Sequence, residues 1–270
     1  MDLILFLILI IVAFGIGIIA AALGIGGGLL MVPTLTLFFD VPIHEATGTS
    51  LVVIIFTALS GTLAYYRQKR IHYKLGLVYA AVTVPGAIIG AFLASELDAS
   101  ALKILFGVCM IPVAARMIIS PKKRSFPLNE NSQTPEADIL DHLPPLTRQQ
   151  YSFGLLLGFI AGLASGLLGI GGGAIAVPAL TLVIGLPMHF AVATSAFVMI
   201  FTSTAGVAVK IWKQDVAWDY VLPMALGIIF GAQVGARFAK RIPAERLQQI
   251  FGGLLVVVLI RMILLGLGII

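Results

Sequence analysis

Two glycine-rich stretches carry the residues of this sequence that are best suited to bind a ligand. The first reads Gly24-Ile25-Gly26-Gly27-Gly28, and the second reads Gly169-Ile170-Gly171-Gly172-Gly173. Each interrupts an apolar run and is followed by a run long enough for half a membrane-spanning helix. The first N–H groups of such a helix have no helical acceptor and carry partial positive charge. Because glycine lets a ligand approach the backbone closely, the pattern predicts an anion site built from backbone dipoles.

A second helix start follows each glycine-rich stretch and offers hydroxyl groups. These segments are Thr47-Gly48-Thr49-Ser50 and Val192-Ala193-Thr194-Ser195. Serine and threonine at a helix start serve either as caps of the helix or as ligand contacts, and the sequence leaves both roles open. The candidate hydroxyl contacts are Thr49, Ser50, Thr194 and Ser195.

Two histidines, His44 and His189, stand just before these helix starts. They are the duplicated titratable groups near the predicted sites. Packing at an interface or capping a helix is the simpler role for them. Gating or proton sensing is the alternative, because histidine changes its charge near physiological pH.

Charged side chains are missing from the middle of every predicted membrane span. Deep charges usually mark proton or cation paths, so their absence argues against a carboxylate-based sodium or metal transporter. An intramembrane hydrolase would need an acid, a base or a bound metal at the reacting bond, and no hydroxyl here has a deep partner base. The single cysteine, Cys109, has no partner for a disulfide or a metal site. We therefore expect no enzyme activity, no cofactor and no metal.

The composition places the chain in a lipid bilayer. Hydrophobic residues make up 60% of the sequence, charged residues make up 11%, and the mean hydropathy is +1.09. A soluble domain carries about 25% charged residues, so this chain has too few to cover a surface in water. The net charge of +5 is small and lies in loops. It therefore indicates membrane orientation rather than nucleic-acid binding.

The apolar runs predict the helices that must position the glycine-rich stretches. Several runs reach the ~20 residues that cross about 30 Å of hydrocarbon. The elements predicted in the first half are Leu3–Leu23, the half-helix Leu29–Phe39, Ala46–Tyr66, Leu75–Ala94 and Leu102–Ile119. Those predicted in the second half are Tyr151–Leu168, the half-helix Ala174–Ile184, Phe190–Ile211, Tyr220–Phe238 and Leu247–Gly268. The first run is expected to stay in the fold rather than act as a signal peptide, because no basic residue precedes it and its counterpart lies in mid-chain.

The two halves of the chain repeat one another at an offset of 145 residues, which joins Gly24 to Gly169. Roughly a third of the paired positions carry the same residue, which indicates an internal duplication. Thr47-Gly48 nevertheless becomes Val192-Ala193, so the predicted site is pseudo-symmetric. Breaks at matched positions of two halves are the best sequence pointer to a transporter binding site.

These features predict an all-α polytopic membrane protein of two homologous halves, each with four full transmembrane helices and one broken or half-helix. The first repeat covers residues 1–119, a polar linker covers 120–147, and the second repeat covers 148–270. The halves are inverted if the break and half-helix add a net crossing, and parallel if they do not. Placing the dense basic loops in the cytoplasm favours the inverted arrangement, with both termini outside and the linker inside.

The doubled motif resembles that of a known family. It reads Gly-x-Gly-Gly-Gly, three residues, Val-Pro and Leu-Thr-Leu, with a later Thr-Ser, and it is similar to the TauE/SafE, or sulfite exporter, family of membrane permeases. The resemblance covers nearly the whole chain outside the linker. It implies a secondary transporter of small sulfur-containing anions. The residues to which the family pattern carries over are Gly24, Gly26, Gly27, Gly28, Pro33, Gly169, Gly171, Gly172, Gly173 and Pro178.

We therefore expect the two breaks to meet near the bilayer centre and to bind a small oxyanion such as sulfite or an organosulfonate. Transport would proceed by rocking of one half against the other in a bacterial cytoplasmic membrane. A passive small-anion channel and a carrier of another small organic acid anion are the alternatives. A membrane enzyme lacks a nucleophile or base at depth, and an assembly subunit would not need matched breaks. The sequence does not decide the direction of transport, whether protons are the coupling ion, or whether the protein forms a homo-oligomer.

Overall fold

The computed structural model describes residues 3–118, 148–238 and 244–268, and the regular elements in these ranges are all α-helices. The helices of the first half are α1 (Leu3–Leu23), α2 (Gly28–Phe38), α3 (Ile43–Arg67), α4 (Tyr73–Glu96) and α5 (Ala99–Ile118). Those of the second half are α7 (Arg148–Leu168), α8 (Gly173–Leu182), α9 (Met188–Trp212), α10 (Trp218–Phe238) and α11 (Ala244–Gly266). The predicted polar linker, residues 120–147, lies outside the described residues, so its placement stays a prediction.

The helix predictions are confirmed to within a few residues at each end. Within the described ranges, α1, α3, α4, α9 and α10 are long and apolar enough to cross a membrane. The other helices contain shorter apolar stretches, among them the half-helix Gly28–Phe38. The chain is therefore an all-α, multi-pass membrane protein.

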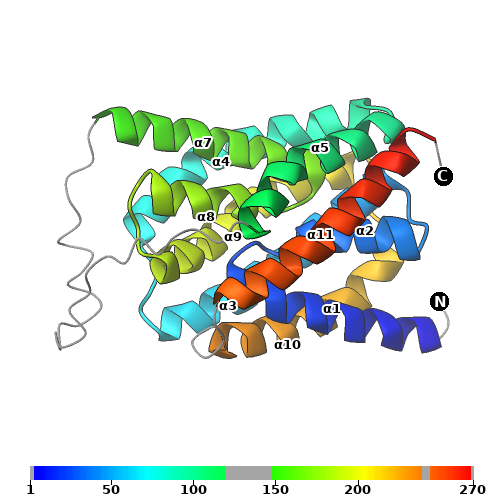
Figure 1. Cartoon of the computed structure of the whole chain (residues 1–270), viewed down its shortest axis with the longest axis horizontal. Coiled ribbons are helices and arrows are strands. Elements are labelled where there is room, and N and C mark those ends of the chain that lie inside the picture. Colours follow the sequence, from blue (N-terminus) through cyan, green and yellow to red (C-terminus); the bar gives the residue numbers. More distant parts are fainter. Residues whose placement is uncertain (1–2, 119–147, 239–243, 269–270) are drawn as a thin grey trace.

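Helices of one half pack mainly on helices of the other. Helix α1 lies along α10, α4 lies along α7, and α5 pairs with α11 (Figure 1). Helices α3 and α9 contact each other in the interior, and each also touches a long helix of the opposite half. The 145-residue offset turns the α1–α10 contact into the α7–α4 contact, so the packing follows the sequence repeat.

Glycines allow these close helix pairs. A Cβ atom added at Gly86 or Gly90 of α4 would run into backbone carbonyls of α7. The equivalent residues, Gly231 and Gly235 of α10, face the carbonyls of Phe14 and Ile18 of α1 in the same way. Small residues at matched positions therefore bring the helix backbones together, as is usual in membrane proteins.

The chain reverses at each glycine-rich break. In Figure 1, α1 starts at the end where the N-terminus is marked, and α2 runs back toward that end. In the second half, Ile184 just beyond α8 contacts Gly154 near the start of α7 (Figure 1 shows α7 starting at the opposite end from α1). The half-helix thus returns the chain to the end where the preceding long helix began, and the opposite directions of α1 and α7 come from the three helices that follow α2.

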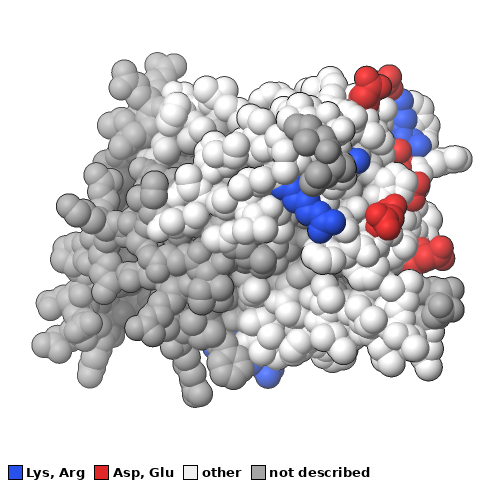
Figure 2. Space-filling view, turned by 45° about the vertical axis from the view of Figure 1, so that its right-hand side comes forward, with Lys and Arg blue, Asp and Glu red and all other residues white. Residues whose placement is uncertain are grey.

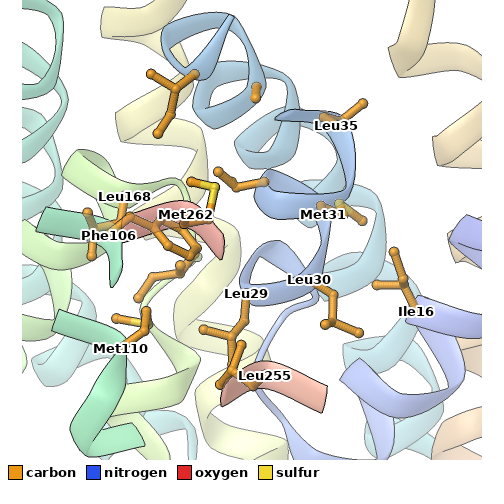
Figure 3. Close-up of a cluster of buried hydrophobic side chains, with 14 of the residues drawn as sticks. Ile16, Leu29, Leu30, Met31, Leu35, Phe106, Met110, Leu168, Leu255 and Met262 are labelled. Carbon is orange, nitrogen blue, oxygen red and sulfur yellow. The ribbon is translucent and has the colours of Figure 1, made fainter. Parts of the chain in front are cut away.

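The half-helix α2 is embedded in a large apolar cluster. Figure 3 shows Leu29 and Leu30 of α2 among side chains of α5, α7 and α11. The partners labelled there include Phe106, Met110, Leu168, Leu255 and Met262. Backbone that leaves the helical pattern at membrane depth must be covered by protein or must line a cavity, and this cluster covers the first break.

Candidate functional site

The two glycine-rich breaks meet, as the sequence predicted. A Cβ atom added at Gly28 would collide with the carbonyl oxygen of Gly169, and one added at Gly173 would collide with the carbonyl oxygen of Gly24. The contacts are reciprocal and follow the 145-residue offset. We call residues 24–28 and 169–173 together the glycine crossing. At Gly28 and Gly173 no other residue type fits without moving the facing backbone.

The glycine crossing starts two helices at one place. Gly27 and Gly172 stand immediately before α2 and α8 and have φ values of 90° and 79°. These angles lie in the left-handed region, which side chains other than glycine rarely adopt. The carbonyl of Gly27 accepts the N–H groups of Leu30 and Met31 at 3.0 Å each, so the N–H groups before Leu30 precede the first bonds of α2. The positive ends of two helix dipoles therefore face the crossing.

Each half anchors the break of the other through a serine. The Ser50 hydroxyl of α3 donates to the carbonyl of Gly169 at 2.5 Å, and the Ser195 hydroxyl of α9 donates to the carbonyl of Gly24 at 3.2 Å. Both serines are fully buried. Each also bonds a carbonyl one turn earlier in its own helix, on Thr47 in one case and Val192 in the other. The candidate serines thus contact the crossing, with their hydroxyls directed at its carbonyls.

Two larger side chains complete the contact. Met199 of α9 lies against Gly26 and Gly173, with its sulfur 2.7 Å and 2.9 Å from the Cβ positions of these glycines. Ile54 of α3 lies against Gly171, its methyl carbon 2.9 Å from the corresponding Cβ position. Ile54 and Met199 are related by the 145-residue offset. The crossing is therefore closely packed.

The candidate threonines lie one position before the serines and make a different contact. Thr49 accepts the backbone N–H of Ala217 at 2.9 Å, and Thr194 accepts the backbone N–H of His72 at 3.1 Å. The hydroxyls therefore attach the α9–α10 corner to α3 and the α3–α4 corner to α9. Both threonines are fully buried beside the crossing.

The remaining predicted site residues lie farther along the chain. Pro33 is buried in α2 and Pro178 is half-buried in α8, each more than one turn beyond the start of its helix. His44 is half-buried in the first turn of α3, and its Nδ1 atom has no hydrogen-bond partner in the described part of the chain. His189 is exposed in the first turn of α9.

A small cavity of about 10 Å³ adjoins the crossing and has room for about one water. It extends from Gly24 and Gly26 between α1, α3 and α9 toward Tyr65 near the end of α3. The other lining residues are Ala20, Ala21, Thr57, Ala58, Gly61, Ala196 and Met199. Small side chains thus leave space beside the backbone of the first break.

A larger cavity of about 260 Å³ lies at the far end of α2. Its walls include Thr36 and Asp40, and Lys103 of α5 and Arg261 of α11 also line it. Acidic side chains gather at the same end of the molecule in Figure 2, where the loops α2–α3, α4–α5 and α9–α10 lie. Cations in a cavity at this end could attract an anion to the mouth of the protein.

One buried charged group was not predicted from the sequence. Lys210 of α9 has no exposed surface, and its Nζ atom lies 3.1 Å from Asp215 Oδ2 and 3.5 Å from Ser95 Oγ. Ser95 in turn donates to Asp215 Oδ2 at 2.6 Å. The signal in the sequence was a lysine just inside the end of the predicted run Phe190–Ile211, five residues before an aspartate.

Comparisons with known proteins agree with the fold and the glycine motif. The family model described as sulfite exporter TauE/SafE matches residues 9–262. The probable membrane transporter protein YunE of Bacillus subtilis is 33% identical over 262 residues, covering 94% of this chain and 95% of the relative. The probable membrane transporter protein MJ0441 of Methanocaldococcus jannaschii is 30% identical over 263 residues, covering 92% and 91%. No solved structure is significantly similar to the chain. The chain belongs to the TauE/SafE sulfite exporter family of membrane transporters.

Proposed function

We propose that the protein is a secondary transporter of small sulfur-containing anions, such as sulfite or organosulfonates, and that the anion binds at the glycine crossing. The observation that carries this proposal is the reciprocal contact of the two breaks, Gly28 with Gly169 and Gly173 with Gly24. Matched helix breaks at a repeat interface are where transporters bind substrate. The substrate class comes from the description of the family, sulfite exporter.

The chemistry of the crossing suits a small oxyanion. Helices α2 and α8 both begin there, and the start of a helix attracts negative charge through its N–H groups and dipole. The hydroxyls of Ser50 and Ser195 are further donors, which a small rotation would redirect from a carbonyl to the ligand. A site without a fixed charge binds an anion weakly enough to release it, as transport requires.

We infer that the two halves are inverted repeats in the membrane. The opposite directions of α1 and α7 support this arrangement (Figure 1). The basic corner between α3 and α4, with Arg67, Lys69 and Arg70, lies at the end opposite the acidic loops. The positive-inside rule therefore assigns the α3–α4 corner to the cytoplasm and both termini to the outside. The small cavity at the crossing then extends toward the cytoplasmic side, and rocking of the halves would open the other side.

Transport of labelled sulfite into liposomes that contain the purified protein tests the proposal. Uptake above that of empty vesicles is expected, and accumulation under an imposed pH gradient would indicate a proton-linked carrier. Uptake that merely equilibrates would favour a passive anion channel. Absence of sulfite uptake, with uptake of a small carboxylate instead, would replace the substrate class.

Variants of the glycine crossing test the site separately from the substrate. Gly27→Leu and Gly172→Leu should abolish transport while the protein still inserts, because both positions need a left-handed backbone. Gly15→Ala in α1 is the matched control, since a Cβ atom there meets nothing within 4 Å. Normal transport by both leucine variants would exclude the glycine crossing as the binding site.

A further inference from the structure

Lys210 is a buried cation near the end of a membrane-spanning helix, and the transport site described above does not use it. Its side chain has no exposed surface, whereas the side chain of its partner Asp215 is 19% exposed. An ammonium group has three N–H donors, and the contacts to Asp215 and Ser95 use two of them. Ionisable groups buried at membrane depth are costly and typically mark the path of a substrate or an ion.

A stripe along α9 connects Lys210 with the glycine crossing. Ser195, Met199, Ser203, Gly206 and Lys210 follow one another at intervals of three or four residues, which places them on one face of the helix. The first two contact the glycine crossing, and the last lies at the acidic end. We call these five residues the α9 stripe.

Two buried hydroxyls, one in this stripe and one beside it, have no hydrogen-bond partner among the described residues. Ser203 of α9 and Ser165 of α7 are both fully buried, and neither Oγ atom bonds any group in the described part of the chain. The Cα atom of Gly166 lies 3.8 Å from the Cβ position of Gly206, so the α7 segment that carries Ser165 adjoins the α9 stripe. Buried hydroxyls are normally satisfied, and a ligand that visits the site can supply the missing partner.

The equivalent residues of the first half show what such a stripe can line. The 145-residue offset pairs Ser165 with Ala20, Ser203 with Ala58 and Lys210 with Tyr65. All three first-half residues line the small cavity beside the crossing.

The second-half stripe is covered. Leu51 lies 3.0 Å from the Cβ position of Gly206, and Gly48 is packed against the carbonyl of Asp215. Thr49 holds the same corner through the N–H of Ala217.

We propose that the α9 stripe and Ser165 form the path by which a small oxyanion passes between the glycine crossing and the acidic end of the protein. Lys210 attracts the anion on this path, and the Ser165 and Ser203 hydroxyls donate to it. Asp215 holds the Lys210 ammonium while the path is closed, and the anion takes over one of its donors when the corner moves away from α3. The proposal rests on the function proposed above and adds a cation and two hydroxyls that determine specificity for anions.

Cysteine accessibility tests the path without knowledge of the substrate. Ser203→Cys and its counterpart Ala58→Cys are made in a Cys109→Ala background, which removes the single native cysteine. A negatively charged, membrane-impermeant thiosulfonate is added to right-side-out or to inverted membrane vesicles. Ser203→Cys should react from the acidic side and Ala58→Cys from the basic side. Phe201→Cys, on the exposed face of α9, is the lipid-facing control. Reaction of Ser203→Cys at the rate of the control, or from the basic side, would overturn the proposal.

Transport kinetics test the role of the cation. Lys210→Gln should raise the KM for sulfite by about tenfold, whereas Lys210→Arg should stay within about threefold of wild type. Lys213→Gln is the matched control, because Lys213 pairs with the exposed Glu96 and should leave KM unchanged. Since Lys210→Gln leaves Asp215 without its cation, the double variant Lys210→Gln/Asp215→Asn is measured as well, and it should show the same increase.

An unchanged KM in both glutamine-containing variants would make Lys210 a structural ion pair and overturn its assigned role. Failure of the proposed function gives a different result, because a wild-type protein that carries no sulfite would still show the two-sided cysteine pattern. A wild-type protein that carries sulfite but lacks the pattern would keep its function and lose the path.

Discussion

The two sides of the glycine crossing have the same backbone arrangement, but different side chains lie on each side. On the first-half side, Tyr65 donates its hydroxyl to the carbonyl of Ala21 at 2.7 Å. On the second-half side, the equivalent residue is Lys210, which forms an ion pair with Asp215. The glycines and serines of the crossing itself are preserved between the halves.

Under the proposals above, this difference separates the residues that hold the site together from the residues that select its ligand. Reciprocal close contacts need the same residue in both halves, because each break is built against the other. The routes that leave the crossing have no such constraint. One can be lined by alanine and tyrosine and the other by serine and lysine, so under the proposals above the two sides can differ in their affinity for an anion without loss of the symmetric scaffold.

The largest effect is expected where the two halves are alike. Gly28→Ala and Gly173→Ala should each reduce transport to background, because the added methyl group runs into a carbonyl of the opposite break. The two losses should be equal, since the contacts are reciprocal. Transport assays in liposomes measure this, with Gly253→Ala as a control that meets no neighbour within 4 Å. A variant at one break that transports normally would show that the breaks are not equivalent.

A smaller effect separates the two faces. Asp215→Asn leaves the buried Lys210 charge without its counter-charge and should destabilise the protein by about 3 kcal/mol. Tyr65→Phe on the other face loses one hydrogen bond and should cost about 1 kcal/mol. Thermal unfolding in detergent measures both. Equal losses would mean that the ion pair contributes no more than a neutral hydrogen bond.

The two serines of the crossing allow a finer comparison. Ser50→Ala removes a bond of 2.5 Å to the Gly169 carbonyl, and Ser195→Ala removes one of 3.2 Å to the Gly24 carbonyl. We expect Ser50→Ala to cost about 1.5 kcal/mol and Ser195→Ala about 0.5 kcal/mol, because the shorter bond is the stronger one. Both should also raise the KM for the anion. The unfolding midpoints of the two variants measure these losses of stability. A larger loss for Ser195→Ala would contradict the prediction from the two bond lengths.

The sequence was sufficient for the parts of the fold that depend on length and repetition. Apolar runs of about 20 residues predict membrane helices, and four glycines in five residues predict a break. The repeat then predicts that the two breaks meet, as Gly28 and Gly169 do. The reversal of the chain at each break was one of two arrangements that the sequence left open, because an apolar run has no marker of its direction across the bilayer.

The polar groups of the second half were harder to predict for a different reason. Lys210 lies at the end of an apolar run, where a lysine usually reaches the water with its long side chain. Its burial depends on a tight corner that brings Asp215 back to it, with Ser95 from another helix. The serines Ser165 and Ser203 resemble residues that bond their own helix backbone, and the structure was needed to show that they have no partner in the described part of the chain.

The smallest predicted effect compares two equivalent helix glycines, Gly61 of α3 and Gly206 of α9. A Cβ atom at Gly61 meets nothing within 4 Å, so Gly61→Ala should stabilise the protein by about 0.5–1 kcal/mol through its helix propensity. At Gly206 the Cβ atom would lie 3.0 Å from the Leu51 methyl group, so this gain should be offset and Gly206→Ala should be close to neutral. Unfolding midpoints measured in the same detergent distinguish the two. Equal stabilisation would mean that Leu51 moves freely. The second-half route would then be less tightly closed than the contact between Leu51 and Gly206 suggests.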